Sequence, residues 1–189
     1  LSLARIEARG AEDLEVVELA NATEIAIDAL GDASGRVTFR ADGDTRIHGD
    51  EAWLVRAVGN LLENALIHAS DADPIEIVLR RDEDGVVLVV SNSGAVSKHV
   101  RERLFRRFVT TRSDKGGTGL GLSIVRAVAE AHGGRAELRD PGPPKVVLRL
   151  TFPPARRRAA EQIREAADEA REALERRSKP RHDAPSETE

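Results

Sequence analysis

The chain has 189 residues, of which 40% are hydrophobic and 33% are charged, a composition that suits one globular domain with additional solvated helix or tail. Its formal net charge of −4 at pH 7 provides no overall basic field for nucleic acid or for a membrane surface. Cysteine is absent, which excludes disulfides, thiolate metal sites and a cysteine nucleophile. Because methionine is also absent and every apolar run is too short to cross a membrane, we expect a soluble piece of a longer protein.

The first third of the sequence predicts helical segments and short strands. Residues 1–10 are predicted to form the last turns of a helix, and residues 17–30 carry apolar side chains at helical spacing. The alternating runs at 36–40 and 45–49 are typical of strands.

A longer helix is predicted over residues 49–69, with Asp50 as its N-cap. Asn60 and Asn64 lie four residues apart in it, so their side chains share one stripe beside the apolar face. Asparagine is a poor helix-interior residue, and the pair therefore needs a reason. Carboxamide oxygens are hard, neutral ligands suited to Mg²⁺ that also binds nucleotide phosphates, whereas the alternative is two amides that satisfy neighbouring loop carbonyls. The apolar face of the helix consists of Leu54, Val58, Leu61, Leu62 and Ala65.

Two hairpins are predicted in the second half of the chain. Strands at 74–80 and 85–92 flank the first turn, and strands at 135–140 and 145–152 flank the second. A short helix is predicted around residues 101–108.

The composition changes after the double proline at 153 and 154. Residues 154–178 are nearly all Ala, Glu and Arg with a heptad-like alanine seam, which predicts a solvated or loosely docked helix rather than a coiled coil. Residues 179–189 have the composition of a disordered tail.

The stretch GGTGLGLSIVRAVAEAHGG, residues 116–134, runs from a glycine-rich turn into an amphipathic helix. It lacks the Lys and Ser or Thr of a Walker loop and the third glycine of a dinucleotide fingerprint. Gly117, Gly119 and Gly121 still allow close backbone approach, and a helix from about Leu122 presents unpaired amides and a positive dipole end. The glycine-rich turn and the helix N-terminus together favour binding of an anion. The alternative is a glycine-rich turn that leads into a helix and binds nothing.

Four stretches resemble the catalytic ATP-binding domain of sensor histidine kinases, in the GHKL superfamily. NLLENALIHA is similar to the N box, VSNSG to a reduced G1 box, RLFRRF to the F box, and GGTGLGLSIVRAVAEAHGG to the G2 box. The resemblance covers roughly residues 1–152 and implies the Bergerat fold, a two-layer α/β sandwich with a mixed, mostly antiparallel sheet covered by helices on one face. It also implies a dimerisation-domain helix end at 1–10 and an ATP-binding domain at 11–153, followed here by the helix 154–178 and the tail 179–189.

The resemblance implies that Asn64 is the Mg²⁺ ligand and that Asn60 lies near metal and phosphate. Related ATPases such as DNA gyrase carry Glu at the position of Asn60. A carboxylate can act as general base on water and a carboxamide cannot, so we expect ATP to be bound without efficient hydrolysis. The implied phosphate-contacting loop consists of Gly117, Thr118, Gly119, Leu120, Gly121 and Leu122.

The G1 box departs from the family pattern. Its aspartate, which accepts a hydrogen bond from the adenine amino group, aligns with Asn92, an acceptor weaker by about 1 kcal/mol because it is uncharged. Gly94 is expected at the nucleotide, but Val96 replaces the second glycine of the box and removes a hinge. Ile67 replaces a phosphate-contacting Lys, and His68 is expected either to flank the nucleotide or to be an ordinary helix-end histidine.

Between Gly94 and Gly117, seven Lys or Arg side chains stand against two acidic ones. Arg112 or Lys115 is expected to neutralise developing γ-phosphoryl charge, with solvated or partner-facing side chains as the alternative. Phe105 and Phe108 in the same segment are either core residues or a docking knob.

The phosphoacceptor of these kinases is a helical His followed by an acidic residue and then Pro. His48, His68, His99 and His132 lack that context, and His182, which is followed by Asp183 and Pro185, lies in the tail predicted to be disordered rather than on a predicted helix. The expected function is to bind Mg-ATP and deliver the γ-phosphoryl group to a histidine on a helical dimerisation domain outside this chain, from which a response regulator receives it. The whole protein is expected to be a homodimeric bacterial inner-membrane sensor with this domain in the cytoplasm. A GHKL serine kinase or anti-sigma factor, and a degenerate nucleotide-binding module without kinase activity, are the alternatives.

Overall fold

The structure is a computed structural model that describes residues 14–70, 73–109 and 119–155. The predictions for residues 1–10 and 179–189, and for all but the first two residues of 154–178, lie outside these ranges. The described residues belong to one compact unit that ends at Ala155. Its elements in chain order are β1 (Glu15–Glu18), α2 (Leu19–Asp28), the 3-10 helix η2 (Gly31–Arg36), β2 (Val37–Asp42), β3 (Arg46–Gly49), α3 (Glu51–His68), β4 (Ile75–Asp82), β5 (Gly85–Ser93), α4 (Lys98–Arg101), α5 (Gly121–Ala131), β6 (Arg135–Pro141) and β7 (Lys145–Phe152).

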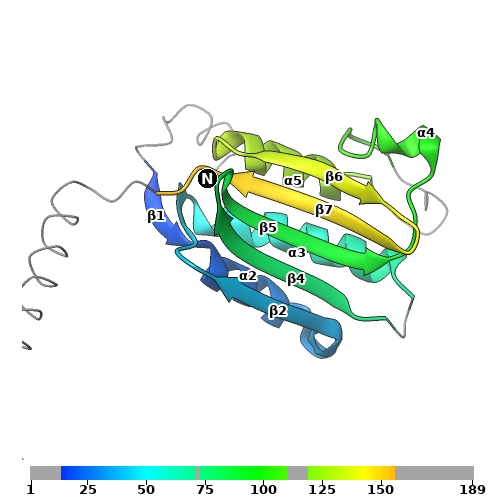
Figure 1. Cartoon of the computed structure of the whole chain (residues 1–189), viewed down its shortest axis with the longest axis horizontal. Helices are drawn as coiled ribbons and strands as arrows, with labels where there is room; N and C mark the ends of the chain where they lie inside the picture. Colours follow the sequence, from blue (N-terminus) through cyan, green and yellow to red (C-terminus); the bar gives the residue numbers. More distant parts are fainter. Residues whose placement is uncertain (1–13, 71–72, 110–118, 156–189) are drawn as a thin grey trace, which may run out of the picture. The chain divides into compact units, whose positions relative to one another are not determined.

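A five-stranded sheet with the strand order β2-β4-β5-β7-β6 forms one layer of the domain. Strands β2 and β4 are parallel, and the other neighbours are antiparallel. Helices α2, α3 and α5 lie together behind one face of this sheet (Figure 1). The described residues therefore confirm the predicted two-layer α/β sandwich with a mixed, mostly antiparallel sheet.

The core lies between the sheet and the three helices. In β4 the side chains alternate, so that Ile75, Ile77 and Leu79 are buried while the residues between them are exposed. The predicted apolar face of α3 is confirmed, with Ala57 as an additional buried member. The predicted N-cap of α3 is also confirmed, because the side chain of Asp50 accepts a hydrogen bond from the Trp53 amide.

A second, two-stranded sheet joins β1 and β3. The prediction of a helix from residue 17 was wrong at its start, because Val17 pairs with Ile47 and the helix begins only at Leu19. Strand pairing has overridden the helical spacing of the sequence here. On the other side of β3, Pro154 forms a bridge with Ile47 and the Ala155 amide donates to the Arg46 carbonyl, so β3 lies between the two ends of the described unit.

The short helix predicted around residues 101–108 lies earlier in the chain. Helix α4 covers only Lys98–Arg101, and Glu102–Phe108 follow in turns and bends. Phe108 has a φ of +63°, which a continued right-handed helix cannot contain. Phe105 packs against the core, whereas Phe108 is 76% exposed.

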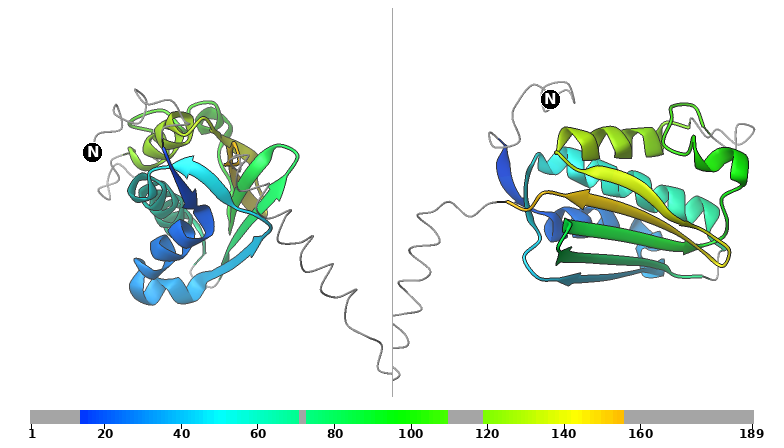
Figure 2. Two further views of the ribbon diagram at one scale, coloured as in Figure 1. Left: turned by 90° about the vertical axis from the view of Figure 1, so that its left-hand side faces the viewer. Right: turned by 45° about the horizontal axis from the view of Figure 1, so that its top comes forward.

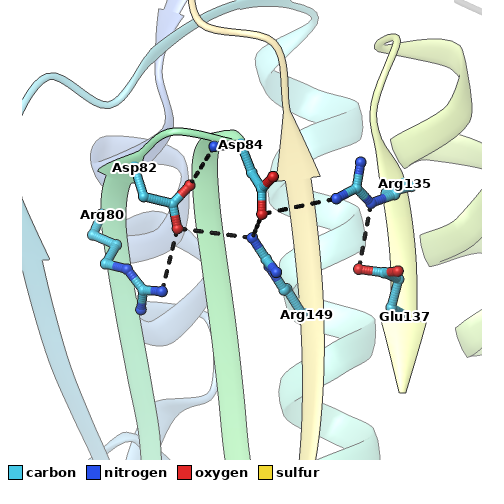
Figure 3. Close-up of polar contacts among 6 residues, drawn as sticks. All are labelled: Arg80, Asp82, Asp84, Arg135, Glu137 and Arg149. Carbon is cyan, nitrogen blue, oxygen red and sulfur yellow. Dashed lines mark hydrogen bonds and ion pairs between the residues drawn. The ribbon is translucent and has the colours of Figure 1, made fainter. Parts of the chain in front are cut away.

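The sheet face opposite the helices carries a network of ion pairs near the β4–β5 turn (Figure 3). The Arg149 guanidinium lies 2.6 Å from Asp84 and 3.7 Å from Asp82. Its hydrogen bond lowers the pKa of the Asp84 carboxyl. Arg135 pairs with Glu137 within β6, the strand next to β7. These charges lie at one end of the outer face of the sheet, while the candidate site described next lies on the helix side.

Candidate nucleotide-binding site

Helix α3 supplies the first part of the candidate site, a stripe formed by Asn60, Asn64 and His68 at four-residue intervals. The Asn60 Nδ2 donates to the Arg56 carbonyl at 2.8 Å, so this amide is oriented by its own helix. Its Oδ1 faces the start of α5, since a Cβ on Gly121 would lie 3.2 Å from that oxygen. The Asn64 side chain is half-buried and makes no hydrogen bond with the described residues. Asn60 and Asn64 therefore present carboxamide oxygens that a cation can use.

The start of α5 supplies the second part. Helix α5 begins after Leu120 with no capping hydrogen bond from a described side chain. The Ser123 hydroxyl donates to the Leu120 carbonyl at 2.7 Å, so it does not cap the first amides either. Leu122 points its side chain into the core and can offer a ligand only its backbone amide. Among the described residues no side chain therefore occupies the amides of the first turn, which is the arrangement that binding of an anion at this helix end needs.

Gly119 and Gly121 both make close contacts inside the protein. Gly119 has a φ of +63°, and a Cβ there would lie 2.8 Å from the Phe108 and Val109 backbone. Its carbonyl accepts a hydrogen bond from the Phe108 amide at 2.9 Å. A Cβ at Gly121 would press on Asn60. The sequence suggested that these glycines allow a ligand to approach the backbone closely. In the structure they allow Phe108 and Val109 to approach Gly119, and Asn60 of α3 to approach Gly121.

The end of β5 supplies the third part. Asn92 is only 3% exposed, and its Nδ2 donates to the Ser93 carbonyl at 2.7 Å while its Oδ1 accepts no hydrogen bond from the described residues. Gly94 has a φ of +129° and lies beside the end of α3, where a Cβ would be 3.4 Å from the His68 carbonyl oxygen. His68 is exposed at this end of the stripe. The stripe on α3 thus extends from the α5 mouth to the end of β5.

Val96 was expected to remove a hinge from the basic segment, and it is held by hydrogen bonds on both of its peptide groups. Its amide donates to the Pro141 carbonyl at 2.7 Å, and its carbonyl accepts from Arg101 Nε at 3.0 Å. The first residues after β5 are therefore fixed to the β6–β7 turn.

The structure brings together Asn60 with Gly121, and His68 with Gly94. It places Asn92 near the end of β5, which Gly94 directly follows. Four of the predicted site residues lie outside the described residues, namely Arg112, Lys115, Gly117 and Thr118.

His132, which the sequence reasoning did not select, is a buried polar residue that ties α5 to α3. It is 1% exposed; its Nε2 accepts from the Asp50 amide at 3.0 Å, and its Nδ1 lies 2.7 Å from the Val128 carbonyl. Since an amide can only donate and a carbonyl can only accept, the ring is neutral with its proton on Nδ1. Burial lowers the pKa of His132, which favours this neutral form. The signal in the sequence was a histidine four residues after Val128 on the apolar face of α5.

Two further features are absent from the described residues. No three His, Asp or Glu side chains of the described residues form a group that could hold a metal ion. No helix within the same ranges is long and apolar enough to span a bilayer.

Comparisons with known proteins identify the family of this chain. A family model described as histidine kinase-, DNA gyrase B-, and HSP90-like ATPase matches residues 49–156, more than half of the chain. The chain is 35% identical over 136 residues to the probable sensor protein PcoS of Escherichia coli. The aligned region covers 69% of this chain and 29% of PcoS. It is 33% identical over 152 residues to the sensor-like histidine kinase SenX3 of Mycolicibacterium smegmatis, covering 73% of this chain and 38% of SenX3.

A solved structure of the mycobacterial sensor histidine kinase MprB superposes with a TM-score of 0.64 and 27% identity, covering 74% of this chain and 97% of the MprB chain. The chain therefore spans well under half the length of PcoS and SenX3 but nearly all of that solved domain. From the matched family, the relatives and the fold, the chain belongs to the histidine kinase-, DNA gyrase B- and HSP90-like ATPases, as an ATP-binding domain of the sensor histidine kinase type.

Proposed function

We propose that this domain binds Mg-ATP between α3, the end of β5 and the start of α5, and transfers the γ-phosphoryl group to a histidine of a helical dimerisation domain outside this chain. A response regulator would then receive the group from that histidine. The observation that carries the proposal is the Asn60 and Asn64 stripe, whose carboxamides face or flank the uncapped first turn of α5. Such a site offers oxygen ligands to a cation and amide donors to phosphate oxygens at one place.

Each group has a defined role in this proposal. Asn64 and Asn60 would hold Mg²⁺, which neutralises charge on the phosphate oxygens when it is bound. The amides of Gly119 to Leu122 would bind phosphate, with Gly117 and Thr118 before them in the chain. Asn92 would accept a hydrogen bond from the adenine amino group through Oδ1, the one acceptor of its side chain, while its Nδ2 donates to the Ser93 carbonyl. Gly94 and His68 would lie beside the nucleotide, and Arg112 or Lys115 would neutralise charge during transfer.

The donor set favours transfer to a separate acceptor over hydrolysis. In the transfer, the bond between the γ-phosphorus and the β–γ bridging oxygen breaks, a bond to the acceptor nitrogen forms, and ADP leaves. A carboxamide at Asn60 cannot remove a proton from water, so the site lacks a general base there. The domain would therefore act by positioning and charge neutralisation. In the whole protein we place it on the cytoplasmic side of a homodimeric membrane sensor.

Calorimetry with ATP, in the presence and absence of Mg²⁺, tests the binding part. The Asn64→Ala variant should weaken Mg-ATP binding by at least about tenfold to a hundredfold, since losing even a group that only orients a metal ligand has an effect of that size. Glu63→Ala is the matched control, because Glu63 is the exposed neighbour of Asn64 on the same helix. Equal affinities for both variants and the wild type would contradict the assignment of Asn64.

Adding the separate helical domain and labelled ATP tests the transfer part. We expect acid-labile label on that domain, as phosphohistidine gives. Acid-stable label on serine would favour the related serine kinases. Absence of any binding at millimolar Mg-ATP would favour a degenerate module.

A further inference from the structure

The two helices that carry the candidate site lie side by side (Figure 2), and α5 contacts α3 or the residue before it at both of its own ends. Gly121 at the start of α5 lies against Asn60, and His132 directly after α5 is hydrogen bonded to the backbone of Asp50, directly before α3. Asp50 to Asn60 is ten residue steps and Gly121 to His132 is eleven. At about 1.5 Å per residue these spans are about 15 and 16.5 Å long. Because the spans nearly match, fixing one end determines which residues meet at the other.

We propose that His132 is a positioning residue for the nucleotide site: its hydrogen bond to Asp50 sets the axial position of α5 along α3. It thereby sets the separation between the first-turn amides of α5 and the carboxamides of Asn60 and Asn64. A slip of one residue would move α5 by about 1.5 Å and turn it by about 100°. Gly121 would then no longer face Asn60. The inference rests on the proposed function for its consequence, but its structural part is tested without nucleotide.

The surroundings of His132 suit this role. Its Nδ1 donates to the Val128 carbonyl of its own helix, which orients the ring relative to α5 and leaves Nε2 for Asp50. Gly49 leaves space for the ring, since a Cβ there would lie 2.8 Å from its Cδ2. The Phe152 ring meets it edge-on, with centroids 6.4 Å apart. A ring enclosed on these sides transmits the position of α5 to residue 50 with little slack.

Two substitutions separate the hydrogen bonds of His132. In His132→Gln the longer side chain brings an amide oxygen within reach of the Asp50 amide, so the bond between the helices is kept. In His132→Asn the shorter amide reaches only the Val128 carbonyl, so the bond within α5 is kept instead.

A cross-link reads the position of α5 directly. A Cβ at Gly121 would lie 3.8 Å from the Asn60 Cβ, which is near the mean separation of about 3.8 Å in native disulfides. The chain has no cysteine, so the pair Asn60→Cys and Gly121→Cys can form only one disulfide within a molecule. We expect rapid oxidation with His132 or His132→Gln present, and oxidation slower by about tenfold with His132→Asn. Equal rates in all three, or no cross-link with His132 in place, would overturn the proposal.

If His132→Asn does not fold, Gly49→Ala replaces it, because the added methyl group would lie 2.8 Å from His132 Cδ2 as well as 2.9 Å from Leu54 Cδ1. Slower oxidation of the same cysteine pair is again expected. An unchanged rate would count against the role of the ring.

Calorimetry with Mg-ATP on the single variants reads the consequence for the site. We expect His132→Asn to bind about tenfold more weakly and His132→Gln to bind like the wild type. Val87→Ala is the control for lost stability, because Val87 is fully buried on the sheet face opposite the helices. Equal weakening in His132→Asn and His132→Gln, or a matching loss in Val87→Ala, would reduce His132 to an ordinary core residue. A wild type that binds no Mg-ATP would refute the proposed function alone, and the cross-link would still decide the position of α5.

Discussion

The two ends of the α3–α5 pair differ in how completely their polar groups are satisfied. At the His132 end, both ring nitrogens and the Asp50 side chain have hydrogen-bond partners. At the Gly121 end, the first-turn amides of α5 and the Asn64 carboxamide have no side-chain partner among the described residues. Polar groups that no described side chain satisfies, gathered in one place, are what the proposed Mg-ATP site requires. The closed end stabilises the helix pair, and the open end keeps donors and acceptors for binding.

The largest effect is expected from breaking the closed end with Gly134→Ala. An added methyl group would overlap the Thr151 carbonyl oxygen and lie 2.9 Å from Phe152 Cδ1. Because the first of these neighbours is backbone, we expect a loss of about 3 kcal/mol in the free energy of unfolding, measured in urea. Gly35→Ala is the control, since nothing lies within 4 Å of its added group. A Gly134→Ala domain as stable as the control would show that β7 can move away freely.

Asp50→Ala should loosen the same end by a smaller amount. It removes the side-chain cap on Trp53, which costs about 1 kcal/mol. Asp50→Asn keeps a capping oxygen and should be nearly neutral. Thermal unfolding of the three proteins compares them, and equal losses in both variants would mean that the charge matters and the cap does not.

Gly59→Ala should strengthen α3 between its two ends. Gly59 lies inside the helix and has nothing within 4 Å of an added Cβ. Replacing a helical glycine with alanine stabilises by about 0.5–1 kcal/mol. We expect a higher melting temperature with unchanged Mg-ATP affinity. Weaker binding would mean that the nucleotide approaches the Gly59 backbone.

The smallest effect is expected from changing the pH, which titrates His132 at the closed end and so changes the free energy of unfolding. The pKa of His132 in the folded domain is lowered by burial, against the opposing charge of Asp50, so the unfolded chain takes up this proton more readily. The stability contributed by the neutral ring is therefore complete above pH 6.5, the ordinary pKa, and is lost as the pH falls below it. Urea unfolding across this range should show a smaller pH dependence for His132→Gln. Identical curves would assign the titration to another group.

The elements with strong local patterns could be predicted from the sequence. The alternation in β4, the apolar face of α3 and its Asp50 cap are all confirmed, because each depends on neighbours within a few residues. The start of α2 and the course of the chain after Arg101 were mistaken, because Val17 is decided by β3 and Phe108 by contact with Gly119. The close approach of Asn60 to Gly121 and the role of His132 depend on packing between distant segments, which spacing along one chain does not report.

The position of β3 has a practical meaning for building hybrid proteins. Strand β1 pairs with one edge of β3, and Pro154 and Ala155 bind to its other edge. The first and last described segments of this unit are therefore separated only by β3. Neighbouring entry and exit points favour circular permutation and insertion of a whole domain into another host. A chimaera joined before β1 and after Ala155 would exchange the whole unit while keeping its two junctions close together in space.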